Sequence, residues 1–326
     1  MQFHAEFTPQ PFSYRIKHTD KLLLLGSCFT EQIGAKLAKA KFKVLDNPNG
    51  ILFNPISICQ AMYSYCKGYE YTEDDLFYFN ELWGSWKHHT RFSGIDKMKT
   101  LEGLNASQKE ASNYVKTADW IMLTLGSAFV YEKTETNGPG YENVVANCHK
   151  VPNDKFNRRL LNPSEIIEQL KTMMEAVWEI NPGAKFMYTI SPVRHLREGF
   201  IENNRSKAAL IQAVHHLTSE NVFYFPSYEL IIDDLRDYRF YAEDMVHPNY
   251  AATNYVWGKF VEACIDKPSQ QLMEEINALN AARNHKAFNP QSEAHKKFLK
   301  TNLEKIVQLK SRCPYLNFEE EEKYFS

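Results

Sequence analysis

The sequence predicts an α/β protein, a three-layer α/β/α sandwich around a five-stranded parallel sheet. Short apolar runs alternate along the chain with longer stretches of helical periodicity, which is the pattern of a parallel sheet with helices on both faces. The 326 residues can bury a large core, and they show neither an internal repeat nor a low-complexity linker. We therefore expect one elaborated domain rather than two separate ones.

Five apolar runs are the strand candidates. They are Lys21 to Gly26, Phe42 to Leu45, Trp120 to Leu125, Lys185 to Ile190 and Val222 to Phe225. After the first run, Phe29, Ile33 and Leu37 fall on one helical face. Another helix opens at Pro163 and Ser164, and its apolar face is formed by Ile166, Leu170, Met173, Met174 and Val177.

Two regions depart from this alternation. Residues 68–103 are rich in aromatic residues and glycine without a clean period, so we predict a long insertion between the second and third β/α units. After Pro248 the chain predicts a helix to Ile265 and then amphipathic helices near residues 269–283 and 291–310. We divide the chain into a principal domain, residues 1–266, and a helical C-terminal extension, residues 267–326.

Composition narrows the class of protein. The formal net charge is -2 and no block of Lys or Arg can follow a phosphate backbone, so nucleic acid is not an expected partner. The six cysteines are scattered without CxxC spacing, which predicts reduced thiols and a cytoplasmic location. No apolar segment reaches the roughly 20 residues of a membrane span, so no membrane association is expected. The oligomeric state leaves no signal in the sequence.

Ser27 is the first candidate catalytic residue. The run LLLLGSCF passes directly from a strand into a helix and puts Ser27 at the carboxyl end of a parallel strand, where open α/β sheets bind ligands. Gly26 permits a tight turn, and the free N–H groups of the helix's first turn can stabilise a developing oxyanion. The alternative is that Ser27 only caps the helix, as serine very often does.

A candidate general base lies far downstream, in YAEDMVHPNY. Asp244 and His247 stand three positions apart just before Pro248, which begins the next helix. At this separation the carboxylate can fix the imidazole tautomer and leave the other ring nitrogen free to take a proton. The alternative is an ordinary surface turn. Together with Ser27, the pair matches the chain order of one hydrolase architecture with a Ser-His-Asp triad.

These residues lie within a series of short sequence blocks. The first is GSCF at Gly26 to Phe29, and the last is DMVHP at Asp244 to Pro248. Between them come DNPNGILFNP, TLGSAFVY, NCHKVP and SPVRH with ENNRSKA. With these blocks the sequence resembles the GSCFA family over about residues 20–260, with Thr30 in place of the last alanine of the family's motif. That family is similar to SGNH hydrolases.

The resemblance implies an SGNH or flavodoxin-like fold, a serine nucleophile in the first block and an oxyanion glycine in the second, at Gly50. The third block of SGNH enzymes usually supplies an Asn side chain as another oxyanion donor, but this chain has GSA at residues 126–128. We expect Ser127 to replace that donor because it occupies the matching block. Asn54 and Asn147 are the alternatives.

Other polar residues in the blocks are candidates for substrate binding: Asn54, His89, Asn147 and His149. Adjacent histidines project in different directions, so we expect only one of His88 and His89 to face the site and favour His89. Cys28 adjoins Ser27, but we expect it in the core because cysteine is among the most buried residues. No metal-ligand spacing is present, so neither a metal nor a cofactor is expected.

The combined features predict a serine esterase that hydrolyses a small acyl or acetyl ester through an acyl-enzyme. A small-molecule or carbohydrate-linked ester is the preferred substrate class. Two alternatives stay open. One is an acyltransferase that uses the same triad, and the other is a catalytically inactive SGNH-like binding protein, which the missing third-block Asn suggests.

Overall fold

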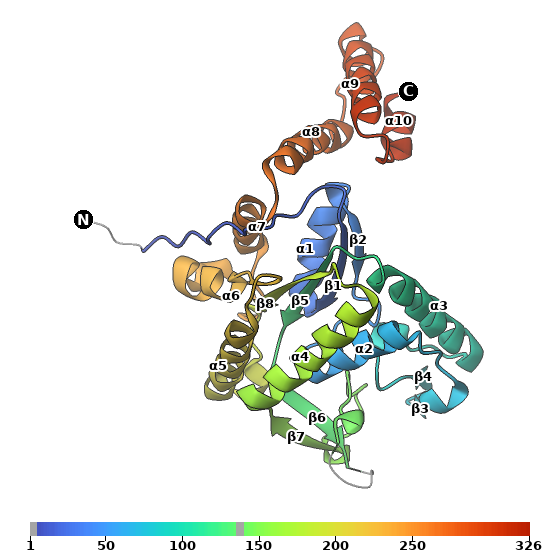
Figure 1. Cartoon of the computed structure of the whole chain (residues 1–326). Helices are drawn as coiled ribbons and strands as arrows, with labels where there is room; N and C mark the ends of the chain where they lie inside the picture. Colours follow the sequence, from blue (N-terminus) through green and yellow to red (C-terminus); the bar gives the residue numbers. More distant parts are fainter. Residues whose placement is uncertain (1–4, 135–139) are drawn as a thin grey trace.

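The fold is organised around one parallel sheet with strand order β2-β1-β5-β8-β9 (Figure 1). The computed structural model describes residues 5–134 and 140–326. The strands are β1 (Lys21–Gly26), β2 (Lys43–Asp46), β5 (Trp120–Leu125), β8 (Lys185–Ile190) and β9 (Val222–Tyr224). All five predicted strands are confirmed, and the chain changes direction between β1 and β5, which is where open α/β sheets bind ligands.

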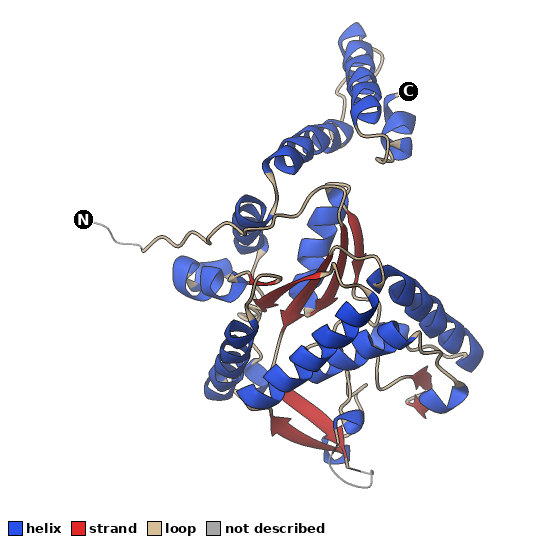
Figure 2. Ribbon diagram, in the orientation of Figure 1, coloured by secondary structure: helices blue, strands red, loops and turns tan. Residues whose placement is uncertain are grey.

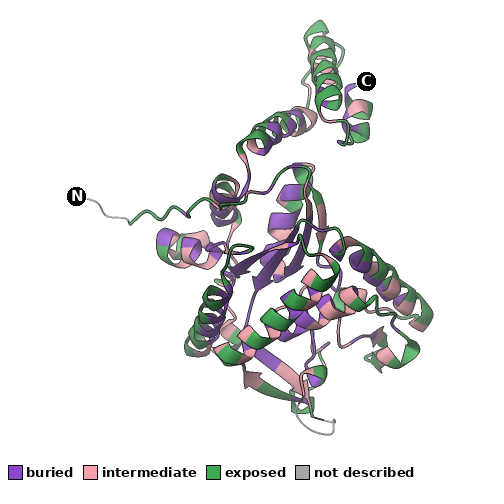
Figure 3. Ribbon diagram, viewed as in Figure 1, coloured by how far each residue is buried: buried purple, intermediate pink, exposed green. Residues whose placement is uncertain are grey.

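Helices cover both faces of the sheet, so the predicted three-layer sandwich is confirmed (Figure 2). Leu23 and Leu25 of β1 pack toward one set of helices, whereas Leu22 and Leu24 pack toward the other. The first set is α2 (Pro55–Lys67), α3 (Lys97–Val115), α4 (Pro163–Ile180) and α5 (Phe200–Leu217). The second is α1 (Cys28–Lys39) and α7 (Tyr250–Cys264), with α6 (Ser227–Glu229) running into a π-helical turn, Leu230–Leu235. The three central strands are buried, whereas the edge strand β2 and the outer helix faces are partly exposed (Figure 3).

The region predicted as an insertion holds a short ribbon of β3 (Phe77–Phe79) and β4 (Leu82–Gly84) between the 3-10 turns Glu73–Asp75 and Thr90–Phe92. Helix α3 begins inside the predicted range, because Asp96 caps it by accepting the Lys99 N–H at 3.0 Å. A second ribbon, β6 (Phe129–Lys133) with β7 (Phe156–Leu160), was not predicted.

Three helices follow the sheet domain and share a hydrophobic cluster of their own. They are α8 (Lys267–Arg283), α9 (Glu293–Arg312) and α10 (Glu319–Phe325), drawn in orange to red in Figure 1. The His18 N–H, just before β1, donates to Ser269 Oγ at 2.7 Å, and Lys41 pairs with Glu321 at 3.0 Å. The extension therefore docks at the amino edge of the sheet, opposite Ser27. Among the described residues, no helix has the length and apolar character to cross a bilayer.

Gly26 is required where β1 meets α1. Its φ is +144°, and a Cβ there would lie 2.2 Å from the Thr124 carbonyl oxygen of the neighbouring strand. We predict that Gly26→Ala strongly lowers the free energy of unfolding in urea or prevents folding. Gly103→Ala is the matched control, because Gly103 is exposed in α3 with open space at its Cβ and alanine should stabilise that helix by up to about 1 kcal/mol. Equal effects of the two substitutions would contradict this account.

Candidate active site

Ser27 lies at the carboxyl end of β1 and caps α1. Its hydroxyl oxygen accepts the Phe29 N–H at 3.3 Å, and its own N–H donates to the Thr124 carbonyl oxygen at 3.2 Å. The residue is only 1% exposed. Ser27 therefore does cap α1, but this bond uses only an acceptor site of the hydroxyl. The hydroxyl proton stays available for donation to a base.

Asp244 and His247 form a closely bonded pair in the turn before α7. Asp244 Oδ2 lies 2.7 Å from His247 Nδ1, and Asp244 Oδ1 accepts the backbone N–H groups of Val246 at 2.9 Å and His247 at 3.0 Å. Bonds from the His247 backbone and ring lower the pKa of Asp244 to about 2. An ionised carboxylate at Nδ1 keeps the proton on that nitrogen, so Nε2 carries the lone pair that can accept a proton.

Two neighbouring helices bring this pair and Ser27 to the same corner. Helix α1 starts directly after Ser27, and α7 starts three residues after His247. The Thr253 hydroxyl of α7 donates to Gln32 Oε1 of α1 at 2.8 Å, so the two helices are in contact close to their N-termini. Among the hydrogen bonds of the described residues there is none between Ser27 and His247, and the His247 side chain is 43% exposed.

Gly50 lies in the loop after β2, next to His89. Its φ is +79°, and a Cβ there would meet the His89 Cβ at 2.3 Å, so only glycine fits. The Gly50 N–H already donates to the Asn47 carbonyl oxygen at 2.7 Å. To donate to an oxyanion, the Gly50 N–H must give up its hydrogen bond to the Asn47 carbonyl oxygen. His89 caps the following turn through its Nδ1, which accepts the Arg91 N–H at 3.3 Å.

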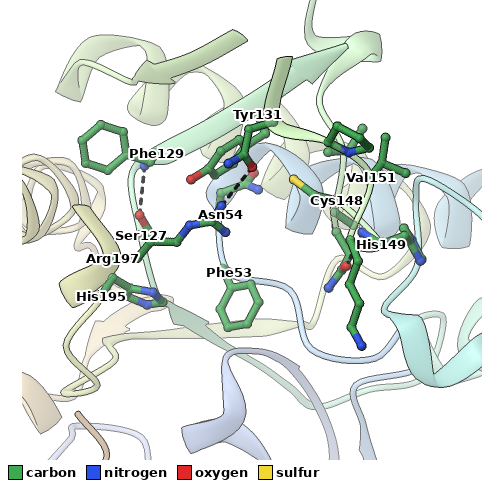
Figure 4. A pocket seen from close by; sticks show the side chains of 16 residues that line it. Phe53, Asn54, Ser127, Phe129, Tyr131, Cys148, His149, Val151, His195 and Arg197 are labelled. Carbon is green, nitrogen blue, oxygen red and sulfur yellow. Dashed lines mark hydrogen bonds between the residues drawn. The ribbon is translucent and has the colours of Figure 1, made fainter. Parts of the chain in front are cut away.

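A cavity of about 640 Å³ opens at the same edge of the sheet (Figure 4). Its wall combines aromatic rings, amides and two cations with a few aliphatic residues, namely Phe53, Asn54, Ser127, Phe129, Tyr131, Val145, Ala146, Asn147, Cys148, His149, Lys150, Val151, Pro152, Asn153, His195 and Arg197. These described lining residues include no Asp or Glu, whereas Lys150 and Arg197 contribute positive charge. Ser27, Gly50, His89 and the Asp244–His247 pair are not part of this wall.

Four of the predicted site residues therefore meet in the cavity, and each of them already makes a hydrogen bond within the chain. Asn54 caps α2 through its Oδ1, which accepts the Ser57 N–H at 2.8 Å. Asn147 accepts the His149 N–H at 2.8 Å, and His149 Nε2 lies 3.0 Å from the Ser85 carbonyl oxygen. The Ser127 hydroxyl accepts the Phe129 N–H at 3.1 Å (Figure 4) and lies 3.3 Å from Ser206 Oγ.

His195 lies between the cavity and the turn that holds the Asp244–His247 pair. It lines the cavity, and its Nε2 would lie 3.3 Å from a Cβ placed on Gly126. The preceding residue, Arg194, donates its N–H to the Val246 carbonyl oxygen at 3.1 Å, which ties this loop to the turn that holds His247. Burial lowers the pKa of His195 to about 3, and the nearby charges of Lys207 and His247 contribute to this lowering.

The buried face of α5 supports this region with polar side chains. Lys207 is 1% exposed, and its Nζ donates to the carbonyl oxygens of Gly126 at 2.6 Å and Ser191 at 2.7 Å. Burial lowers the pKa of Lys207 to about 7. Ser206 Oγ accepts the Ala128 N–H at 2.7 Å, and Asn203 Oδ1 accepts the His195 N–H at 2.9 Å. Spacing of three and four positions puts these side chains on one helical face.

Comparison with known proteins decides the family. Residues 21–260 match the GSCFA family. The chain belongs to the GSCFA family. Residues 276–326 also match the C-terminal domain of GSCFA domain proteins, and no curated protein matches the sequence.

Two solved structures resemble this GSCFA protein distantly. One is a carbohydrate esterase family 3 protein from Talaromyces cellulolyticus, at 12% identity and a TM-score of 0.37, covering 80% of this chain and 99% of that one. The other is an acetyl esterase mutant with an acetate ion, at 12% identity and a TM-score of 0.37, covering 80% and 100%. The fold assignment stands on the sheet topology alone.

Sequence reasoning about this GSCFA chain missed the polar face of α5. It singled out the block ENNRSKA, and the spacing of Asn203, Ser206 and Lys207 there was a signal that helical periodicity could have found. Cys28 was expected in the core, but it is only partly buried, because it is the first residue of α1 at the edge of the sheet. Among the described residues, no group of three His, Cys, Asp or Glu is placed to hold a metal ion.

His88 and His89 point in different directions, as expected. The His88 ring is 1% exposed, packs against Tyr71 and Phe92 at centroid distances of 4.8 and 5.3 Å, and has no hydrogen bond to either nitrogen within the described chain. Burial lowers the pKa of His88 to about 3 from the usual 6.5. His88 is therefore a neutral, structural histidine in this protein.

A pH dependence of stability follows from His88. The unfolded chain binds a proton at this histidine near pH 6.5 while the folded chain does not until about pH 3, so the free energy of unfolding should fall as the pH drops through that window. We predict that His88→Phe, which preserves the aromatic packing, reduces this slope by up to about 1.4 kcal/mol per pH unit. Urea unfolding across the window measures it, with exposed His216→Gln as the control. An unchanged slope in His88→Phe would contradict the assignment.

Proposed function

We propose that this GSCFA protein is a serine ester hydrolase in which Ser27 is the nucleophile, His247 the general base and Asp244 the group that orients it. The observation that carries the proposal is the 2.7 Å contact between His247 Nδ1 and Asp244 Oδ2, in the turn before α7, the helix that contacts α1. An orienting carboxylate, an imidazole with a free Nε2 and a serine at a strand end are the parts of a triad.

The reaction would run in two halves. Ser27 Oγ attacks the acyl carbon while His247 Nε2 takes the hydroxyl proton, and the tetrahedral intermediate then expels the alkoxide, which receives that proton from His247. A water molecule next attacks the acyl-enzyme with His247 again as the base. The carboxylic acid leaves, and Ser27 regains its proton.

The resting geometry is compatible with this chemistry. Hydrogen bonds between catalytic groups are often long without substrate and tighten in the substrate complex, so the absence of a direct bond to Ser27 among the described residues does not exclude His247. The 43% exposure of the His247 side chain gives water access to the base. That access favours hydrolysis over acyl transfer, which needs water to be excluded from the acyl-enzyme.

The cavity beside the triad residues supports a carbohydrate-linked acyl ester as substrate. Aromatic rings such as Phe53 and Tyr131 offer flat apolar surfaces to a sugar ring, and amides such as Asn147 suit its hydroxyl groups. Lys150 and Arg197 favour a ligand with negative charge, because no acidic side chain lines the described wall. Gly50 and Ser127 are candidate oxyanion donors, each after exchanging the hydrogen bond that it now makes.

A fluorophosphonate probe tests the nucleophile. We predict that the wild-type chain is labelled and that Ser27→Ala is not, since the probe phosphonylates an activated serine hydroxyl. Cys28→Ser is the matched control at the adjacent position and should still be labelled. Labelling of Ser27→Ala together with loss of labelling in Cys28→Ser would assign the chemistry to position 28.

Asp244→Asn tests the orienting role of the carboxylate. The amide cannot hold the same histidine tautomer, so we predict a fall in kcat of roughly a thousandfold or more with an unchanged circular dichroism spectrum. Glu243→Gln is the matched control, because it removes a charge from the neighbouring exposed residue and should leave kcat near the wild-type value. Normal turnover in Asp244→Asn would mean that another group orients the base.

A further inference from the structure

His195 contains a buried polar atom without a partner. Its Nε2 is shielded from solvent and makes no hydrogen bond within the described residues. Leaving such an atom unpaired costs on the order of 1–3 kcal/mol. The buried nitrogens of His88 are also unpaired within the described chain, but that ring packs among aromatic side chains, whereas His195 lines the cavity. The unpaired Nε2 is therefore suited to a partner that arrives with the substrate.

The position of Nε2 relates it to the nucleophile. Gly126 directly follows β5, and a Cβ on this glycine would lie 3.3 Å from Nε2. In the parallel pairing of β1 and β5, Gly26 lies opposite Thr124, so Ser27 and Gly126 follow neighbouring strand ends. Neighbouring strands are about 4.8 Å apart. His195 Nε2 thus lies over the end of the strand adjacent to Ser27.

The backbone and the ring of His195 are held by separate contacts. Asn203 Oδ1 accepts the backbone N–H of His195 at 2.9 Å, and the ring of Phe53 packs edge-on against the His195 ring at a centroid distance of 5.6 Å. The bond from the Arg194 N–H to Val246 fixes the same loop against the turn of His247. A donor fixed before the reaction needs little reorganisation in the transition state, which is the property that makes an oxyanion donor effective.

His195 is also in the right charge state to act as a neutral donor. Burial holds its pKa near 3, so the ring is uncharged at neutral pH, and it can donate one hydrogen bond from Nε2 when the proton is on that nitrogen. Ser127 is less suitable, since its hydroxyl already binds the Phe129 N–H and lies beside Ser206 (Figure 4).

We propose that the Nε2–H of His195 donates a hydrogen bond to the oxyanion that forms when Ser27 attacks an ester. The unpaired nitrogen over Gly126 thereby replaces the Asn that is missing from the third block. This role rests on the proposed function, because it requires acyl chemistry at Ser27. It adds a catalytic residue that does not belong to the triad.

Kinetics of the full chain with 4-nitrophenyl acetate test the role. We expect His195→Ala to lower kcat by roughly a hundred- to a thousandfold with little change in KM, as for other oxyanion donors. His195→Gln keeps an N–H of similar reach and should recover a large part of that loss. Ser127→Ala is the matched comparison at the third block and should lose much less. In all three variants the pH profile of kcat/KM should keep its shape, because His195 does not titrate near neutral pH.

The outcomes separate this role from the triad. Wild-type kcat in His195→Ala, with fluorophosphonate still labelling Ser27, would overturn the role of His195 and leave the proposed hydrolase intact. A changed shape of the pH profile in His195→Gln would make His195 the base instead. If fluorophosphonate labels no serine in the wild-type protein, both proposals fail. If His195→Ala does not fold, a crystal structure with a phosphonate on Ser27 decides, since Nε2 should lie within about 3 Å of the phosphonyl oxygen.

Discussion

The candidate site depends on one buried cation. The Lys207 ammonium is removed from water, which is costly unless hydrogen bonds compensate it, and its Nζ binds the carbonyl oxygens of Gly126 and Ser191. These carbonyls follow β5 and β8, so one side chain of α5 holds together the two strand ends that border the site. Ser206 and Asn203, on the same helical face, then fix Ala128 and His195. The third block and the loop after β8 are thereby held as one unit.

The unit formed by the third block and the loop after β8 lies between two parts of the site that differ in their physical properties. The corner of Ser27 and His247 is built from helix starts, where backbone N–H groups and a locally bonded carboxylate are present. The cavity beyond it is larger, and it is lined by rings, amides and cations. His195 belongs to both parts, since its ring lines the cavity while its loop is tied to the turn of His247. In the proposed reaction, His195 is therefore the side chain that the binding cavity and the site of bond cleavage share.

The predictable features were the local ones. The strands could be predicted from the sequence because buried parallel strands are apolar runs. The Asp244–His247 contact could be predicted because its partners are only three positions apart. His195 and Lys207 could not be assigned in this way. The position of Nε2 over Gly126 depends on how the loop after β8 packs, and the acceptors of Lys207 lie 81 and 16 residues away in sequence. The composition likewise predicted the insertion, but the pairing of β3 with β4 inside it could be seen only in the structure.

The charge of Lys207 links the neutral histidine to the proposed oxyanion. A cation near His195 disfavours a second positive charge, which is why Lys207 contributes to lowering the pKa of His195 after burial, the larger cause. The same cation would attract negative charge on a nearby ester oxygen. A positive charge disfavours protonation of His195 and favours an oxyanion for the same electrostatic reason. Burial lowers the pKa of Lys207 itself to about 7, so about half of this charge is present at pH 7 and the rest is lost as the pH rises further. In the proposed reaction, a neutral donor and a buried cation would thus act in the same direction, and that reaction would not need the amide that the third block lacks.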